Sequence, residues 1–190
     1  LGGALSDHWP IEHRQKPLLI EIGFGMGETL ASVAREDRSR RYLGIEVHPP
    51  GIGSMLQHIE AYRLDHVRLI QHDAVEVLQS LIPDETVAAF HIYFPDPWPK
   101  KRHHKRRLIQ SNFVSLLASR LKPGGYLHCA TDWEPYARSM LEVLSAEAGL
   151  SNLASGYHQR PHWRPMTKFE ARGLRLGHVV KDLLFQKNPK

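Results

Sequence analysis

The stretch Leu18-Leu-Ile-Glu-Ile-Gly-Phe-Gly-Met-Gly-Glu28 decides the fold class of this 190-residue chain. Its first five residues form an apolar run interrupted only by Glu21, which is typical of a buried β-strand. Three glycines at alternate positions follow, and they favour a tight turn because glycine accepts backbone conformations that other residues avoid. A helix is expected directly afterwards, over residues 28–35. The stretch therefore predicts a strand, a glycine turn and a helix in succession.

The same alternation continues along the chain. Further strands are expected at residues 42–47, 67–71, 87–94, 126–131 and 178–186. Helices are expected between them, at residues 53–64, 74–81, 108–121 and 134–148. Strands separated by single helices indicate a Rossmann-like α/β fold, with a mostly parallel sheet, helices on both faces and an antiparallel last strand. We expect one domain over residues 1–190, with an irregular segment at residues 1–17.

In such a sheet a ligand binds at the carboxyl ends of the strands. The glycine turn at Gly23, Gly25 and Gly27 lies at such an end. It lacks the third glycine of a dinucleotide site, because Glu28 occupies that position, and it lacks the lysine of a phosphate-binding loop. A plain structural turn is the alternative interpretation of these glycines.

Acidic residues follow the first strands of the predicted sheet. Glu46 comes about 20 residues after the glycines, where a carboxylate can accept both hydroxyls of a ribose. Asp73 follows the next strand, near the expected place of an adenine, although it could also cap the helix that begins at Ala74. Glu21 would face the amino-acid part of a ligand. An adenosine without phosphate contacts indicates S-adenosylmethionine (SAM).

A rigid loop follows the fourth expected strand. The sequence Pro95-Asp-Pro-Trp-Pro-Lys100 has three prolines in six residues, which suits the positioning of groups over a cofactor, although Trp98 could simply cover the core. We define the basic segment as Lys100 to Arg107. It holds six of the 25 lysines and arginines, one more than the net charge of +5, and this concentration indicates a polyanionic partner. His103 and His104 lie within it without a nearby carboxylate or cysteine at ligand spacing, so no metal is expected.

Composition excludes several other classes. The single cysteine, Cys129, lies in an apolar strand, which excludes a disulfide within the chain and leaves no evident nucleophile for methylation at a pyrimidine carbon. No apolar run has the roughly 20 residues of a membrane helix, and residues 1–7 do not look like a signal peptide. These features favour a cytoplasmic protein, and they leave monomer and homodimer open.

With these residues in place, the chain resembles the bacterial tRNA (guanine-7) methyltransferase family from about Pro17 onward. The motifs that carry the resemblance are Glu21-Ile-Gly-Phe-Gly-Met-Gly27, Gly44-Ile-Glu-Val-His48, Tyr93-Phe-Pro-Asp-Pro-Trp-Pro-Lys100, Ala130-Thr-Asp132 and Thr167-Lys-Phe-Glu170. The glycine turn marks only the wider class of SAM folds, whereas the proline-rich string is far more specific.

The resemblance implies an enzyme that methylates nitrogen-7 of a guanine in tRNA, in the variable loop, with SAM as cofactor. It implies SAM contacts by Glu21, Glu46, Asp73 and Asp96, with Asp96 in the active site. Substrate contacts are implied for Lys100, Asp132, Thr167, Lys168, Phe169 and Glu170. Contacts to tRNA are implied for Arg102, His103, His104, Lys105, Arg106 and Arg107.

Thr167 and Glu170 also fit a helix capping box, so that segment could be scaffold as well as substrate site.

Three rival functions stay open from the residues alone. An adenine amino-group methyltransferase carries a similar acid, proline and aromatic pattern, but the aromatic Trp98 comes one position early here. A SAM-fold RNA-binding protein without catalysis is the second rival. An NAD enzyme is the third, and Glu28 disfavours it.

Overall fold

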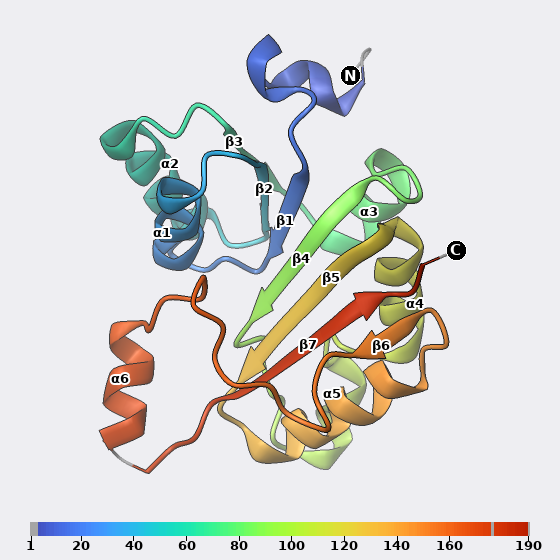
Figure 1. The fold of residues 1–190 in the computed structure, drawn as a ribbon. Helices are drawn as coiled ribbons and strands as arrows, with labels where there is room; N and C mark the ends of the chain where they lie inside the picture. Colours follow the sequence, from blue (N-terminus) through green and yellow to red (C-terminus); the bar gives the residue numbers. More distant parts are fainter. Residues whose placement is uncertain (1–3, 176, 190) are drawn as a thin grey trace.

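A computed structural model describes residues 4–175 and 177–189. Within them lies one seven-stranded sheet with the order β3-β2-β1-β4-β5-β7-β6 (Figure 1). Its strands are β1 Leu18–Ile22, β2 Arg41–Glu46, β3 Val67–Gln71, β4 Val87–Tyr93, β5 Leu121–Thr131, β6 Leu150–Asn152 and β7 Lys181–Lys187. The first five strands are parallel, whereas β7 runs antiparallel to β5 and β6 antiparallel to β7. The predicted fold class is confirmed, including the antiparallel last strand.

Helices cover both faces of the sheet (Figure 1). They are α1 Glu28–Glu36, α2 Pro49–Tyr62, α3 Ala74–Leu81, α4 Ser111–Arg120, α5 Glu134–Ala146 and α6 Lys168–Arg175. Leu30 of α1 and Met55 of α2 belong to one buried cluster on their face. Val77, Leu117 and Met140, from α3, α4 and α5, belong to the larger cluster on the other face. Residues of β1 and β4 are buried throughout because both faces of these central strands are covered.

Some expected boundaries differ from the observed ones. The helix expected over 53–64 begins at Pro49, because proline at the first helical position loses no hydrogen bond. The helix expected over 108–121 covers Ser111–Arg120 only. Gly124 and Gly125, which follow that expected helix and are of the type that ends helices, lie within β5, where Gly124 has φ +76° near a register shift against β4. A left-handed glycine suits such a bulge as well as a helix end.

Several short elements were not expected from the pattern. The strand β6 is three residues long, and two 3₁₀ turns, η1 Leu5–His8 and η2 Ile11–His13, interrupt the segment expected to be irregular. Residues 168–175, which follow Thr167 of the possible capping box, form the eight-residue helix α6.

The two ends of the sheet have different neighbours. The carboxyl ends of β1, β4 and β5 point toward α6, and the N-terminal turns lie at the opposite end (Figure 1). None of the helices described is both long and apolar enough to cross a membrane.

Candidate active site at the carboxyl ends of the strands

The glycine turn after β1 has a conformation that glycine alone adopts readily. Gly23, Gly25 and Gly27 have φ of +71°, +56° and +83°, which is strained for a residue with a side chain. A Cβ on Gly23 or Gly25 would meet nothing within 4 Å, whereas one on Gly27 would lie 2.5 Å from the sulfur of Met55. The first two glycines therefore leave open space over the turn, and the third allows α2 to pack against it.

Glu46 at the end of β2 holds this turn from the side. One carboxylate oxygen accepts a hydrogen bond from the amide of Gly25 at 2.9 Å. The other accepts from the amides of Val47 and His48, at 2.8 and 3.0 Å. Each carboxylate oxygen has two lone pairs, so Glu46 is fixed by the backbone and keeps one lone pair, on the oxygen that faces Gly25, for a hydroxyl donor.

Asp73 at the end of β3 is the N-cap of α3. One of its carboxylate oxygens accepts from the amides of Val75 and Glu76, at 2.9 and 3.2 Å. The capping alternative is therefore confirmed for Asp73. Its side chain is exposed beside the same edge of the sheet, so a ligand contact stays compatible with the cap.

Glu21 has an unusual environment for a carboxyl group. It is 2% exposed, and its Oε2 has no hydrogen-bond partner in the part of the chain that the structure describes. Burial raises the pKa of Glu21 to about 8. A buried carboxyl without a partner is costly, and Glu21 lies directly before the glycine turn, so it is a candidate to pair with a cationic group of a ligand.

The loop after β4 is strained and braced. Phe94 and Trp98 have φ of +50° and +44°, which is uncommon for large side chains and is typical of functional loops. Arg107 donates from Nε to the carbonyl of Pro97 at 2.8 Å. Asp96 is exposed between these fixed points, and its carboxylate has no hydrogen bond to the described residues. The loop therefore presents an exposed carboxylate at a constrained place.

The basic segment folds as the 3₁₀ helix η3, Lys101–Arg106. Arg102 and Lys105 are exposed. His103 and Arg106 contact Trp98, with the Arg106 guanidinium 5.0 Å from the centre of its ring. One prediction requires correction, because Arg107 is only 6% exposed and its guanidinium lies 4.7 Å from the ring of Tyr136. Arg107 braces the proline-rich loop and is not available on the surface.

Lys100 and Asp132 lie at the same edge of the sheet. Lys100 is exposed at the start of η3. Asp132 follows β5, is partly exposed, and has one carboxylate oxygen 3.7 Å from Nδ1 of His178. This distance is too long for a hydrogen bond, so the Asp132 carboxylate keeps most of its accepting capacity.

Thr167 acts as a helix cap, as its spacing to Glu170 suggested. Its hydroxyl accepts from the amide of Glu170 at 3.0 Å. The Glu170 side chain does not complete a capping box, because both of its oxygens accept from the guanidinium of Arg164, at 2.6 and 2.8 Å. Glu170 is 4% exposed, so the prediction that it reaches a substrate directly is not what this structure shows. The side chains of Lys168 and Phe169 lie outside what the structure describes.

Arg164 joins Glu170 to the sheet through Asp182 and His128. None of these three residues was predicted from the sequence to belong to the site. Nε and Nη2 of Arg164 donate to Asp182 of β7 at 2.7 and 2.9 Å. Asp182 also pairs with Nε2 of His128 on β5 at 2.7 Å, and Nδ1 of His128 lies 2.9 Å from the hydroxyl of Tyr93. These side chains connect α6 with the end of β4, directly before the proline-rich loop.

The pKa shifts of Arg164, Asp182 and His128 indicate which of these buried side chains carry a charge. Burial alone would lower the pKa of Arg164, but its bonds to Glu170 and Asp182 raise that pKa above its usual value. Burial would raise the pKa of Asp182, yet the hydrogen bonds from His128 and Arg164 hold it below its usual value. Burial lowers the pKa of His128 despite the Asp182 carboxylate. Arg164 is therefore a cation held between two carboxylates, beside a neutral imidazole.

Topology thus brings Glu21 of β1 and the acids at or after the ends of β2, β3, β4 and β5 to one edge of the sheet. Cys129 is buried in β5, and burial raises the pKa of its thiol well above the usual value, as expected for a core residue. The site therefore offers fixed carboxylates and an open glycine turn, with a basic segment beside them.

Solved structures with the same architecture define its class. An rRNA methylase from Streptococcus thermophilus aligns with TM-score 0.61 and 12% identity, over 97% of this chain and 92% of that chain. A Streptococcus mutans protein solved in complex with SAH aligns with TM-score 0.61 and 9% identity, over 90% and 89% of the two chains. The fold, with its glycine turn and acidic strand ends, is that of the class I SAM-dependent methyltransferases.

Sequence similarity identifies the family more narrowly. Residues 15–183 match a family model described as "Putative methyltransferase". A curated relative, the tRNA (guanine-N(7)-)-methyltransferase of Nitrosospira multiformis, is 59% identical over 186 residues, which are 98% of this chain and 81% of the relative. The chain therefore belongs to the tRNA (guanine-N(7)-)-methyltransferase family.

Proposed function

We propose that this protein transfers the methyl group of SAM to nitrogen-7 of a guanine in tRNA, and that this guanine lies in the variable loop. The observation that carries the proposal is the combination of an open glycine turn with an exposed carboxylate at Asp96 and an adjacent exposed basic surface. Membership of the family supplies the position methylated. The cytoplasm is the expected compartment.

The glycine turn and its neighbours suit SAM part by part. Glu46, fixed by three backbone amides, would accept a ribose hydroxyl on its remaining lone pair. Asp73 would lie near the adenine while capping α3. Glu21 would pair with the ammonium group of the methionine part, which gives its buried Oε2 a partner.

The chemistry asks little of the protein beyond positioning. Nitrogen-7 of guanine has an in-plane lone pair, so no base has to remove a proton before the methyl group is transferred. The product guanine carries a positive charge, and the sulfonium of SAM becomes a neutral thioether. Asp96 would accept from the N–H donors of the guanine and stabilise the developing charge, with Asp132 beside it. We assign no general base.

The direct test is incubation of the protein with unmodified tRNA and methyl-labelled SAM, followed by nucleoside analysis. We expect the label in 7-methylguanosine at one position of the variable loop. Label in methylated adenosine would support the adenine amino-group alternative. SAM binding without any transferred label would support a binding protein without catalysis.

Glu21 should make SAM binding release a proton near pH 7. Its pKa of about 8 keeps it protonated in the free protein, and a neighbouring ammonium group would lower that pKa. Affinity should therefore rise with pH up to about 8, by at most about tenfold per pH unit. Calorimetry in two buffers of different ionisation enthalpy measures the released proton. The variant Glu21→Gln lacks the carboxyl group, but any proton that SAM itself loses or gains is the same for both proteins. Equal proton release from parent and variant would therefore show that Glu21 does not contact SAM.

The exposed cations of the basic segment should contribute to tRNA affinity. The test is the double variant Arg102→Gln with Lys105→Gln. It retains Arg106 and Arg107, which contact the proline-rich loop. If the side chains of Arg102 and Lys105 both neutralise phosphates, the slope of log affinity against log salt should flatten by about 1.4 to 1.8. SAM affinity should not change.

The matched control for this variant is Lys122→Gln with Arg63→Gln, two exposed cations away from the carboxyl ends of the strands. Filter binding of tRNA at several salt concentrations measures the slopes. Equal slopes for the two double variants would mean that the basic segment does not face the tRNA.

A further inference from the structure

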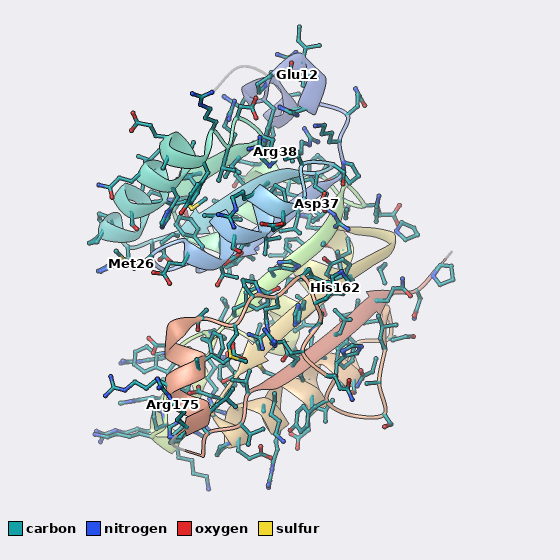
Figure 2. All side chains as sticks on the ribbon, turned by 60° about the vertical axis from the view of Figure 1, so that its left-hand side comes forward. Glu12, Met26, Asp37, Arg38, His162 and Arg175 are labelled. Atoms are coloured by element: carbon teal, nitrogen blue, oxygen red, sulfur yellow. The ribbon has the colours of Figure 1, made fainter. Side chains whose placement is uncertain are left out.

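A second cluster of polar side chains lies at the opposite end of the molecule. Figure 2 shows Glu12 far from Arg175 of α6, on the N-terminal turns. We define the His13 cluster as Glu12, His13, Asp65 and His66. Single ligand atoms of Glu12, His13 and Asp65 lie within 4.8 Å of one another, and His66 borders this group of three through Asp65. His13 is 7% exposed and His66 is fully buried, while Glu12 and Asp65 are exposed.

The ring of His66 directs a lone pair at a carboxylate. Its Nε2 lies 2.9 Å from the carbonyl oxygen of Ala34, and a carbonyl only accepts, so Nε2 carries the hydrogen. In the neutral ring Nδ1 is then an acceptor. Nδ1 has no hydrogen-bond partner among the residues described, and it lies 3.5 Å from Oδ1 of Asp65. Two acceptors facing each other are unfavourable unless a cation lies between them.

The ring of His13 meets the same carboxylate oxygen. Both of its ring nitrogens are buried, and neither has a hydrogen-bond partner within residues 4–175 and 177–189. Its Nε2 lies 3.4 Å from Oδ1 of Asp65, and the centres of the two histidine rings are 5.8 Å apart. An unpartnered imidazole in a buried place is costly, and here it borders a second one.

Two of these separations, from Oδ1 of Asp65 to Nε2 of His13 at 3.4 Å and to Nδ1 of His66 at 3.5 Å, are close to those of a tetrahedral metal site. Ligand bonds of 2.0–2.1 Å to zinc place neighbouring ligand atoms about 3.3 Å apart. Imidazole nitrogens and carboxylates together are a donor set for Zn²⁺ and similar transition metals, rather than for Ca²⁺ or Mg²⁺. We propose that the His13 cluster binds one divalent transition-metal ion of the zinc type, although the sequence pattern predicted no metal.

One neighbouring cation has to be considered. Nη1 of Arg38 lies 3.7 Å from Oδ1 of Asp65. Its guanidinium donates to the carbonyls of Arg63 and Tyr62, at 3.2 and 3.0 Å. Arg38 is therefore held by other acceptors and does not supply the missing donor to either histidine ring.

A metal here would join two segments that are far apart in the chain. Glu12 and His13 belong to η2, and Asp65 and His66 precede β3. The ion would fasten the N-terminal turns to the sheet at the end away from the proposed active site. Its expected effect is on stability, and SAM affinity is expected to be independent of it.

The experiment uses the full chain after treatment with a chelator and dialysis. Titration with Zn²⁺ in a calorimeter should show one tight equivalent, besides weak binding by the many other histidines. Co²⁺ should give the visible absorption of a four-coordinate site. At a hundredfold excess of Zn²⁺ over its Kd, the Tm should rise by about 5 to 10 °C.

Two variants and a control make the test specific. Glu12→Gln changes an exposed residue and should weaken the tight equivalent by at least about tenfold, which is what the loss of an outer-shell partner of the metal costs, while His13→Gln should remove it. His162→Gln alters an exposed histidine outside the cluster and should keep it. Zn²⁺ binding that is the same in the parent and in Glu12→Gln, or a Tm indifferent to Zn²⁺ and chelator, would overturn the proposal, even if His13→Gln fails to fold.

Discussion

Replacing Arg164 with methionine should cost about 3 to 5 kcal/mol of stability, because it leaves Glu170 and Asp182 as buried carboxylates without their cation. Both are less than 5% exposed, and Arg164 itself is 1% exposed. In a chain of this size, that free energy corresponds to a fall in Tm of roughly 6 to 20 °C. Thermal melting measures it directly.

The same variant should lose methylation beyond its loss of folded protein. Arg164 connects α6 with β7, and through Asp182 and His128 with Tyr93, which lies just before the proline-rich loop. Without the ion pair between Arg164 and Glu170, α6 should move away from the carboxyl ends of the strands. Methylation per folded molecule, measured below the melting transition, separates this effect from unfolding.

The control is Arg172→Met, the same change at an exposed position of α6. It should melt within a degree or two of the parent. Combining Arg164→Met with Glu170→Gln and Asp182→Asn removes the stranded charges and should recover part of the stability. A melting temperature for Arg164→Met close to that of the parent would show that the ion pairs of Arg164 with Glu170 and Asp182 contribute little to stability.

Asp96→Asn should lower the rate of methyl transfer by about 10² or more while stability stays unchanged. The change keeps the shape of the side chain and removes the negative charge that we propose to face the guanine. Removing one fixed electrostatic group from a transition-state site typically costs this much in rate. Asp96 is exposed and makes no hydrogen bond to the described residues, so little folding energy depends on it.

Single-turnover methylation at saturating SAM and tRNA measures the chemical step. Glu60→Gln, on the exposed side of α2, removes a charge elsewhere and should keep the parental rate. If Asp96→Asn keeps a near-parental rate, the charge on Asp96 is not part of the chemistry. If it melts much earlier, Asp96 is a structural residue of the loop.

The order and type of the main elements could be predicted because their signals are local. The apolar run of β1 and the glycines after it lie next to each other, and φ of Gly23, Gly25 and Gly27 follows from their position in the turn. Element ends were less predictable. The residues at 122–125 could cap a helix or form a bulge, and only pairing of β5 with β4 decides between them.

The candidate site was predictable to the same extent. Residues that directly follow a parallel strand must lie at its carboxyl end, so Glu46, Asp73 and Asp96 could be placed from the sequence. Their states could not, because the cap made by Asp73 and the amide contacts of Glu46 depend on how the next turn folds. Arg107 shows the limit most clearly, since its place in a charged run suggested solvent and its packing on Tyr136 decided otherwise.

The sequence by itself determined the α/β class, the glycine turn, the acids at the strand ends and, through its motifs, the family. These features depend on neighbouring residues, whose geometry the backbone dictates. Only the tertiary structure decided which charges are buried together. Arg164 meets Asp182 across 18 residues, and His128 meets Asp182 across 54. Such pairs form because each buried charge needs a partner, and the folded sheet alone determines which residues come within reach.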